Sequence, residues 1–472
     1  MKFGTSGLRG LVTDLQGPAT VLYVTAFARH LLDAGFVKPG DRIFVAGDFR
    51  PSTPSIAASC MAALQHAGLQ PINCGAIPTP ALALYAMSQH CACLMVTGSH
   101  IPADRNGIKF YRPDGEIDKS DEEAITRIAA RIGDEISDLS ALPSTNPDSK
   151  AEELFLHRNA SILPAGALSG LKVGVYQHST VARDLLVDVI AGYGAQIVPL
   201  GRSDHFIPVD TEAVSTETID LMTGWVREHA LDAIVSADGD GDRPLIADET
   251  GAPLRGDLLG LIVARFLDAK RVVTPVTSNS GIENAGDFRV VRTRVGSPFV
   301  IEAMNTAIAA GDQAVMGFEA NGGVLLGSRF TTPNSTLSAL PTRDSFVPIL
   351  AALLLAAKER RPLSEIAAGF RLPYALADRL ENTAVEKSAA LMAHLRSARR
   401  NLDAFMAPVG TVSDISDIDG LRITLSDRSI VHFRPSGNAP EMRCYVESED
   451  AKTAASLLEK SLALVRNWMR NH

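Results

Sequence analysis

Short apolar runs alternate with longer segments of mixed polarity along most of the chain, and this pattern predicts buried strands separated by helices. The first set of segments is read as strand, helix, strand, helix and strand over residues 42–46, 54–67, 71–74, 80–88 and 91–96. A second set has the same order over residues 172–176, 181–193, 196–199, 216–229 and 233–237. Alternating strands and helices favour mainly parallel sheets with right-handed crossovers.

A third set repeats this order less regularly. Its predicted strands are residues 271–275, 289–291 and 314–317, and its predicted helix is residues 298–309. Each set ends in a polar, glycine-containing loop that leads into one more short strand, at residues 108–111, 244–247 and 324–326. We therefore expect an α/β protein with three domains of similar mixed-sheet topology. The sets have no evident sequence identity, so chance parallelism among α/β units is the alternative.

After about residue 370 the pattern changes to successive short strands, which we expect to be antiparallel, followed by one amphipathic helix. These segments are residues 421–425, 429–433, 443–447 and 451–469. They predict a smaller C-terminal α+β domain. With a Pro-, Ser- and Asn-rich linker at residues 141–150, the expected domains are residues 1–150, 151–255, 256–370 and 371–472.

Composition narrows the class of protein. The chain has 472 residues, 46% hydrophobic and 21% charged, which is typical of a globular protein with several cores. Its net charge of −9 argues against a nucleic-acid or membrane-surface partner. The longest apolar stretch, residues 347–357, is too short to cross a bilayer and predicts a core helix.

Cysteine usage and the amino terminus favour the cytoplasm. The five cysteines are an odd number and lie mostly within apolar runs, which indicates free buried thiols in a reducing compartment. The chain starts directly in a glycine-rich segment, with no apolar signal sequence before it. We expect a cytoplasmic protein whose partners are small molecules, as a monomer or a homodimer.

Residues 97–109, directly after a predicted buried strand, are the first candidate for chemistry. Gly98 relaxes the backbone at the strand's end, and Ser99 is expected on a tight turn at the carboxyl edge of the sheet, where α/β proteins place their sites. Asn106-Gly107 predicts a second turn, after which Lys109 begins the next strand and can point back at the serine. A hydroxyl with His100 and Lys109 nearby suits covalent catalysis, and an ordinary surface turn is the alternative.

Asp238, Asp240 and Asp242 alternate at the end of another apolar strand, in a loop that otherwise holds only glycine and Arg243. Carboxylates this close repel one another unless a cation lies between them. Their oxygens suit a hard divalent ion, Mg²⁺ or Ca²⁺, and a solvated acidic turn is the alternative.

Three further segments are candidates for anion or sugar binding. Residues 3–10 form a glycine-rich loop around Arg9, unless they are a flexible terminus. Glu319, in a glycine-rich loop, could accept hydrogen bonds from two sugar hydroxyls. Residues 434–438, with Arg443 nearby, offer guanidinium, hydroxyl, amide and backbone N–H donors to a phosphate, unless they are only a hairpin turn.

These five segments together resemble the motifs of the α-D-phosphohexomutase family, in the family's order and over essentially the whole chain. Residues 97–109 are similar to its phosphoserine loop, and residues 238–243 to its metal loop. Residues 318–323 are similar to its sugar loop, residues 434–443 to its phosphate loop, and residues 3–10 to its amino-terminal arginine segment. Residues 3–10 and residues 434–443 are most similar to the corresponding segments of the phosphomannomutase type.

The resemblance implies a four-domain, heart-shaped enzyme with its site in a central cleft. Ser99 would carry a phosphoryl group, and one Mg²⁺ would bind that serine and the three aspartates. Arg9, Arg243, His100 and Lys109 would assist transfer, with Lys109 taking part in proton movement. The remaining assignments are Glu319 and Asn321 for the sugar and Arg434, Ser436, Gly437, Asn438 and Arg443 for the phosphate that does not react.

The implied reaction interconverts mannose 6-phosphate and mannose 1-phosphate through a hexose 1,6-bisphosphate. The same chemistry on glucose or glucosamine phosphates is the alternative, and a non-catalytic sugar-phosphate binding protein is an alternative of another class. A phosphatase is a third alternative, and it would need water to reach the phosphoserine. Gly323 stands where this type often has His, Ser297 where His or Asp often occurs, and Asn321 where Ser is usual; Asn438-Ala439 replaces a common Thr-Glu pair. These departures bear on the proton acceptor and on the sugar preference.

Overall fold

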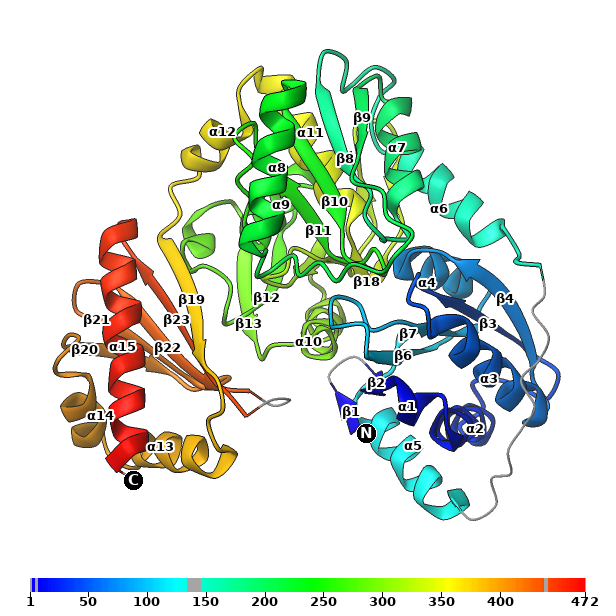
Figure 1. Cartoon of the computed structure of the whole chain (residues 1–472), viewed down its shortest axis with the longest axis horizontal. Helices are drawn as coiled ribbons and strands as arrows, with labels where there is room; N and C mark the ends of the chain where they lie inside the picture. Colours follow the sequence, from blue (N-terminus) through cyan, green and yellow to red (C-terminus); the bar gives the residue numbers. More distant parts are fainter. Residues whose placement is uncertain (1, 5–6, 134–145, 437–439, 472) are drawn as a thin grey trace. The chain divides into compact units, whose positions relative to one another are not determined.

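The computed structural model of the chain describes residues 2–4, 7–133, 146–436 and 440–471 (Figure 1). It divides into two compact units. The first comprises Met1–Val273 and Gly296–Gly369, and the second comprises Thr274–Val295 and Phe370–His472.

The first unit begins with a mixed sheet whose strands lie in the order β1-β2-β6-β5-β3-β4, with β7 beside β6. Its strands are β1 Lys2–Gly4, β2 Gly7–Leu11, β3 Arg42–Gly47, β4 Gln70–Ala76, β5 Ala92–Val96, β6 Arg105–Arg112 and β7 Gly115–Glu116. Its helices are α1 Val12–Leu15, α2 Pro18–Asp33, α3 Thr53–His66, α4 Thr79–Ser88 and α5 Lys119–Ile132. Ile43 and Val45 belong to the core that includes α2, α3 and α5, whereas Phe44, between them, packs on Tyr85 of α4 with ring centroids 4.7 Å apart. Successive side chains of β3 therefore point to opposite faces of the sheet, and helices pack on both faces.

A second sheet in the same unit has the order β11-β10-β8-β9. Its strands are β8 Lys172–Tyr176, β9 Gln196–Leu200, β10 Ala233–Ala237 and β11 Pro244–Ala247. The helices of this part are α6 Lys150–Ala160, α7 Arg183–Gly192 and α8 Thr216–His229. β10 and β8 are parallel, and β11 returns antiparallel to β10.

A third sheet contains β12 Arg271–Pro275, β14 Val315–Phe318, β15 Val324–Leu326 and β18 Leu340–Asp344, in that order. The helices here are α9 Gly256–Phe266, α10 Ser297–Ala309, α11 Phe346–Glu359 and α12 Leu363–Gly369, and β16 Phe330–Thr331 pairs with β17 Thr336–Leu337. α11 is almost entirely buried, which confirms the core helix expected from the longest apolar stretch.

The second unit is built on an antiparallel sheet with the order β19-β23-β22-β21-β20. Its strands are β19 Tyr374–Leu380, β20 Val412–Ser416, β21 Leu421–Leu425, β22 Ile430–Pro435 and β23 Met442–Ser448. The helices are α13 Val385–Ser397, α14 Arg399–Met406 and α15 Ala451–Asn471, and the segment 274–295 adds η2 Ser280–Asn284 and β13 Arg289–Thr293. Glu447 of β23 ties this segment to the sheet by accepting a hydrogen bond from the backbone N–H of Ser280 at 2.9 Å.

The α/β architecture and the recurring order of elements are confirmed. In each sheet of the first unit, one strand runs into a polar loop and returns as an antiparallel neighbour: β5 into β6, β10 into β11 and β14 into β15. The repeat therefore places three comparable loops at strand ends. The division into four domains stays a prediction. Within the described residues, no helix is both long enough and apolar enough to cross a membrane.

Two local predictions were wrong. Residues 7–10 form part of β2 and not a loop, and Arg9 pairs with Gly107 of β6. Asn106-Gly107 accordingly lies within a strand and makes no turn. Asn106 is buried and its amide donates to the hydroxyl of Ser52 at 2.9 Å. A Cβ on Gly107 would lie 2.7 Å from the carbonyl oxygen of Leu8, so this glycine serves close strand packing.

Candidate active site

Ser99 lies between β5 and β6 in a backbone conformation that few residues other than glycine adopt. Its φ is 56°, and its N–H donates to the hydroxyl of Thr97 at 2.7 Å. The side chain is fully buried, its Oγ donates to Oδ2 of Asp238, and it lies 3.3 Å from Nδ1 of His100. The left-handed residue of this turn is thus the serine itself and not Gly98. The turn aims the hydroxyl at the Asp238 carboxylate.

Arg50, just after β3, binds the backbone of this turn through its guanidinium group. This residue was not identified from the sequence. Its guanidinium donates to the carbonyl oxygens of Ser99 at 3.0 Å, Ile101 at 2.5 Å, and Pro102 at 2.8 Å. It also pairs with Asp48 at 3.2 Å and is 1% exposed. A Cβ on Gly98 would lie 2.7 Å from the guanidinium carbon, which explains the glycine at that position. The sequence signal was an Asp and an Arg at the end of a buried strand.

Replacing Arg50 with methionine is expected to destabilise the first unit by about 3–5 kcal/mol, because it leaves the buried Asp48 carboxylate without its charged partner and removes the guanidinium donor from several backbone carbonyl groups. Urea denaturation measures this change. The matched substitution Arg127→Met, at an exposed position on α5, should change stability by less than about 0.5 kcal/mol. Equal effects of the two substitutions would show that the Arg50 contacts do not hold the turn.

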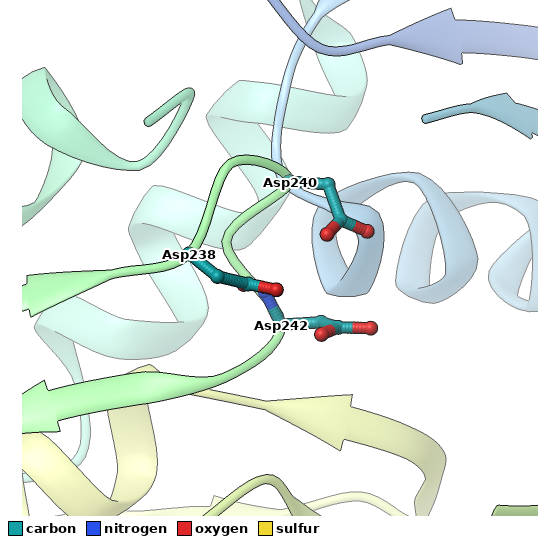
Figure 2. Close-up of side chains that lie close together, drawn as sticks. All are labelled: Asp238, Asp240 and Asp242. Atoms are coloured by element: carbon teal, nitrogen blue, oxygen red, sulfur yellow. The ribbon is translucent and has the colours of Figure 1, made fainter. Parts of the chain in front are cut away.

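The three aspartates predicted to bind metal lie in the loop after β10 (Figure 2). Asp238, Asp240 and Asp242 are fully buried, and each offers a carboxylate oxygen within 4.8 Å of the others. Gly239 lets this loop approach the serine turn, because a Cβ there would lie 2.8 Å from the carbonyl oxygen of Ser99. The alternative of a solvated acidic turn does not fit this burial.

The electrostatics of the cluster fit a hard cation. Burial and the two neighbouring carboxylates raise the pKa of Asp238 to about 8. Oδ1 of Asp240 and Oδ1 of Asp242 are buried and have no hydrogen-bond partner within the described part of the chain. Buried carboxylate oxygens need a partner, and a divalent ion would supply one to all three residues.

Lys109 lies inside β6 and binds the aspartates, where the sequence had suggested that it begins a strand and faces the serine. Its Nζ is 2.6 Å from Oδ2 of Asp240 and 2.5 Å from Oδ2 of Asp242. Burial opposes its charge, but the two carboxylates raise the pKa of Lys109 above its usual value. Lys109 is therefore a cation here, held by two carboxylates of the cluster.

Arg243 and His100 meet beside the serine, and Arg9 interacts electrostatically with Arg243. Arg243 Nη1 lies 2.7 Å from Nδ1 of His100. Burial and the Arg243 charge lower the pKa of His100 to about 3, so the imidazole is neutral at pH 7. Burial and the charges of Arg243 and Arg343 lower the pKa of Arg9 to about 10. Cations crowded together in this way favour binding of a multiply charged anion.

The predicted sugar loop, after β14, is part of the same unit. Glu319 is 5% exposed, and its Oε2 accepts a hydrogen bond from Arg343 Nη1 at 2.8 Å. Asn321 uses its side-chain oxygen within the loop, accepting from the N–H of Gly323 at 3.0 Å. Ser297, at the start of α10, donates to Oε2 of Glu116 at 2.9 Å.

The predicted phosphate loop lies in the second unit. Arg434 of β22 and Arg443 of β23 are directly opposed across the two strands. Arg434 pairs with Asp419 at 2.9 Å, and Arg443 pairs with Glu441 at 2.7 Å. Ser436 follows β22, whereas Gly437 and Asn438 lie outside the described residues. Two opposed arginines on neighbouring strands are suitable residues for a phosphate site.

Three segments of the chain match the phosphoglucomutase/phosphomannomutase family. Its alpha/beta/alpha domain I matches residues 1–135, domain II residues 155–251 and domain III residues 255–372.

Individual proteins match over the full length. A phosphomannomutase of Sinorhizobium fredii is 54% identical over 470 residues and covers 99% of both chains. A phosphomannomutase of Salmonella muenchen is 40% identical over 474 residues, covering 99% of this chain and 96% of that protein. The X-ray structure of a phosphoglucomutase/phosphomannomutase family protein from Burkholderia thailandensis has a TM-score of 0.75 at 18% identity and covers 98% of this chain and 97% of that one. The last likeness shows the fold.

Proposed function

The chain belongs to the α-D-phosphohexomutase family and is most similar to phosphomannomutases, and from this we propose that it interconverts mannose 6-phosphate and mannose 1-phosphate. It is an enzyme of the mutase type. The names of the relatives at 54% and 40% identity support mannose as the sugar. Hexose phosphates as its small-molecule partners, a monomer or homodimer, and a cytoplasmic location are part of the same proposal.

The observation that carries this proposal is the environment of Ser99. A fully buried hydroxyl, aimed at Asp238 by a left-handed turn, has no evident structural reason to be there. The surrounding cations Lys109, Arg243 and Arg9 would neutralise a phosphoryl group on its oxygen. Phosphoryl transfer depends mainly on positioning and charge neutralisation, and these residues provide both.

In the proposed reaction the phosphoryl group of phospho-Ser99 passes to a free hydroxyl of the hexose phosphate. The bond between phosphorus and the serine oxygen breaks while a bond to the sugar oxygen forms. The proton that the sugar hydroxyl loses replaces the proton that Lys109 gives to the departing serine oxygen. The resulting hexose 1,6-bisphosphate turns over and returns its other phosphoryl group to Ser99. Lys109, a cation in the resting site, is placed to donate a proton and to stabilise the transferring charge.

Ser99, Asp238, Asp240 and Asp242 would hold the metal ion, for which we propose Mg²⁺ because the ligand set consists of oxygen atoms alone. When bound, the ion would neutralise the charge on the phosphoserine. Glu319 and Asn321 would bind the sugar, and His100 would keep Arg243 in place through their 2.7 Å contact.

Coupled assays on mannose, glucose and glucosamine 1-phosphates test the sugar preference. We expect kcat/KM to be highest for mannose 1-phosphate. A higher value for glucose or glucosamine 1-phosphate would overturn the mannose proposal and leave the mutase chemistry in place.

The opposed arginines of the second unit should serve both directions of the reaction. A mutase must hold the non-reacting phosphate of both the 1-phosphate and the 6-phosphate, and guanidinium groups tolerate either approach. Arg434→Ala or Arg443→Ala should each cost about 1.5–3 kcal/mol of binding, as a rise in KM for both substrates, and should increase release of the bisphosphate. Steady-state kinetics in both directions measure the effect.

The matched control is Arg400→Ala, which removes an exposed arginine of α14 in the same unit and should leave both KM values unchanged. A defect confined to one substrate would contradict a shared anchor.

A further inference from the structure

Arg343, in β18, is a buried cation to which the proposed chemistry gives no task. It is 2% exposed and ranks with Arg50 among the largest fully buried side chains. Burying a guanidinium is costly unless charged partners surround it, so its partners indicate why it is there.

Those partners belong to two different loops. Arg343 Nε and Nη2 donate to Oδ2 of Asp242 at 3.1 and 2.8 Å, and Nη1 donates to Oε2 of Glu319 at 2.8 Å. One planar fork therefore ties a carboxylate of the metal loop to the carboxylate of the sugar loop. In both cases it holds a single oxygen of the carboxylate.

The fork determines where the other oxygen of Asp242 points. Arg343 and Lys109 both bind Oδ2, while Oδ1 has no hydrogen-bond partner within the described residues and lies 3.7 Å from Nε of Arg243. Asp242 offers one carboxylate oxygen to the cluster with Asp238 and Asp240. Groups that hold the outer oxygen of a metal ligand set its orientation, and their loss typically weakens metal binding about 10- to 100-fold.

Gly323 makes room for this arrangement. A Cβ on Gly323 would lie 2.6 Å from Cδ, 2.7 Å from Cγ and 2.9 Å from Cβ of Arg343. These atoms include the base of the side chain, so a larger residue would force Arg343 to move. The glycine at the end of the sugar loop and the arginine on β18 thus form one structural pair.

We propose that Arg343 is a positioning residue that couples the sugar loop to the metal loop. It orients Glu319 to receive the sugar and Asp242 to face the cation. This inference rests on the proposed function for the sugar but not for the metal, because the Asp242 orientation is a property of the cation site alone.

The test uses Arg343→Lys, which keeps the positive charge and loses the fork. Because the charge is retained, any change in cation binding reports geometry; removal of the charge by itself would tighten binding of Mg²⁺. Calorimetric titration with Mg²⁺ should show affinity weakened roughly tenfold. KM for mannose 1-phosphate should rise by a similar factor, and saturating Mg²⁺ should restore kcat but not KM.

A second variant should displace the Arg343 side chain without substituting the arginine itself. Gly323→Ala should push Arg343 aside and weaken Mg²⁺ binding in the same direction. The matched control is Gly224→Ala on α8, where a Cβ meets no atom within 4 Å and both quantities should stay at the wild-type value.

Wild-type Mg²⁺ affinity or wild-type KM in Arg343→Lys, each to within twofold, would overturn the coupling. Circular dichroism checks that each variant is folded. If the wild type turned over no hexose phosphate, the proposed function would fail, while the Mg²⁺ titration would still decide whether Arg343 orients Asp242.

Discussion

Ser99→Ala should lose nearly all turnover, by roughly three orders of magnitude or more, while the fold and substrate binding survive. Alanine removes the oxygen atom that would carry the phosphoryl group. That oxygen is aimed at the Asp238 carboxylate by the left-handed turn. Serine and alanine both carry a Cβ, so a φ of 56° costs them a similar amount of free energy. The loss of turnover should therefore come from chemistry and not from unfolding.

Intact-protein mass spectrometry provides the second readout. Some wild-type molecules should be heavier by one phosphoryl group, and Ser99→Ala molecules never should. The control is Ser59→Ala on α3, where the hydroxyl donates to the carbonyl oxygen of Ser55 in the same helix at 3.2 Å; both mass and turnover should match the wild type. Full activity in Ser99→Ala would remove the serine from the mechanism.

Asp240→Asn should weaken Mg²⁺ binding by roughly 10- to 100-fold and lower activity at limiting metal to the same degree. The substitution removes one negative charge from the ligand set and places an amide where Oδ2 now accepts from Lys109 at 2.6 Å and Thr79 at 2.5 Å. Calorimetric titration and the dependence of rate on free Mg²⁺ both measure the change.

Chelation of the wild-type enzyme should abolish activity, and Mg²⁺ should restore it. The matched substitution Asp104→Asn, on the exposed part of the serine loop, should alter neither quantity. Turnover that persisted after chelation would mean that the three buried aspartates have another purpose.

The sequence predicted those parts of the molecule whose cause is local. Apolar runs predicted β5, β10 and β14 because the signal of a buried strand lies in the strand's own side chains. The aspartate cluster was equally visible, since Asp238, Asp240 and Asp242 share one loop and the geometry follows from their spacing.

What the sequence could not show depends on residues far apart in the chain. Arg343 is explained only by Asp242, 101 positions away, and by Glu319, 24 positions away. Asn106-Gly107 predicted a turn, but pairing with β2 held it in a strand. Tertiary contacts overrode the local turn propensity of this dipeptide, and the sequence of β6 alone does not indicate its pairing with β2.

The central claim is that the enzyme moves a phosphoryl group within hexose phosphates and does not release it to water. Phosphorus NMR follows this directly, with wild-type enzyme, Mg²⁺, mannose 1-phosphate and a trace of mannose 1,6-bisphosphate. We expect the mannose 1-phosphate signal to be replaced by that of mannose 6-phosphate, while inorganic phosphate stays at the level of a sample without enzyme. Inorganic phosphate that rises as mannose 1-phosphate disappears would contradict the central claim.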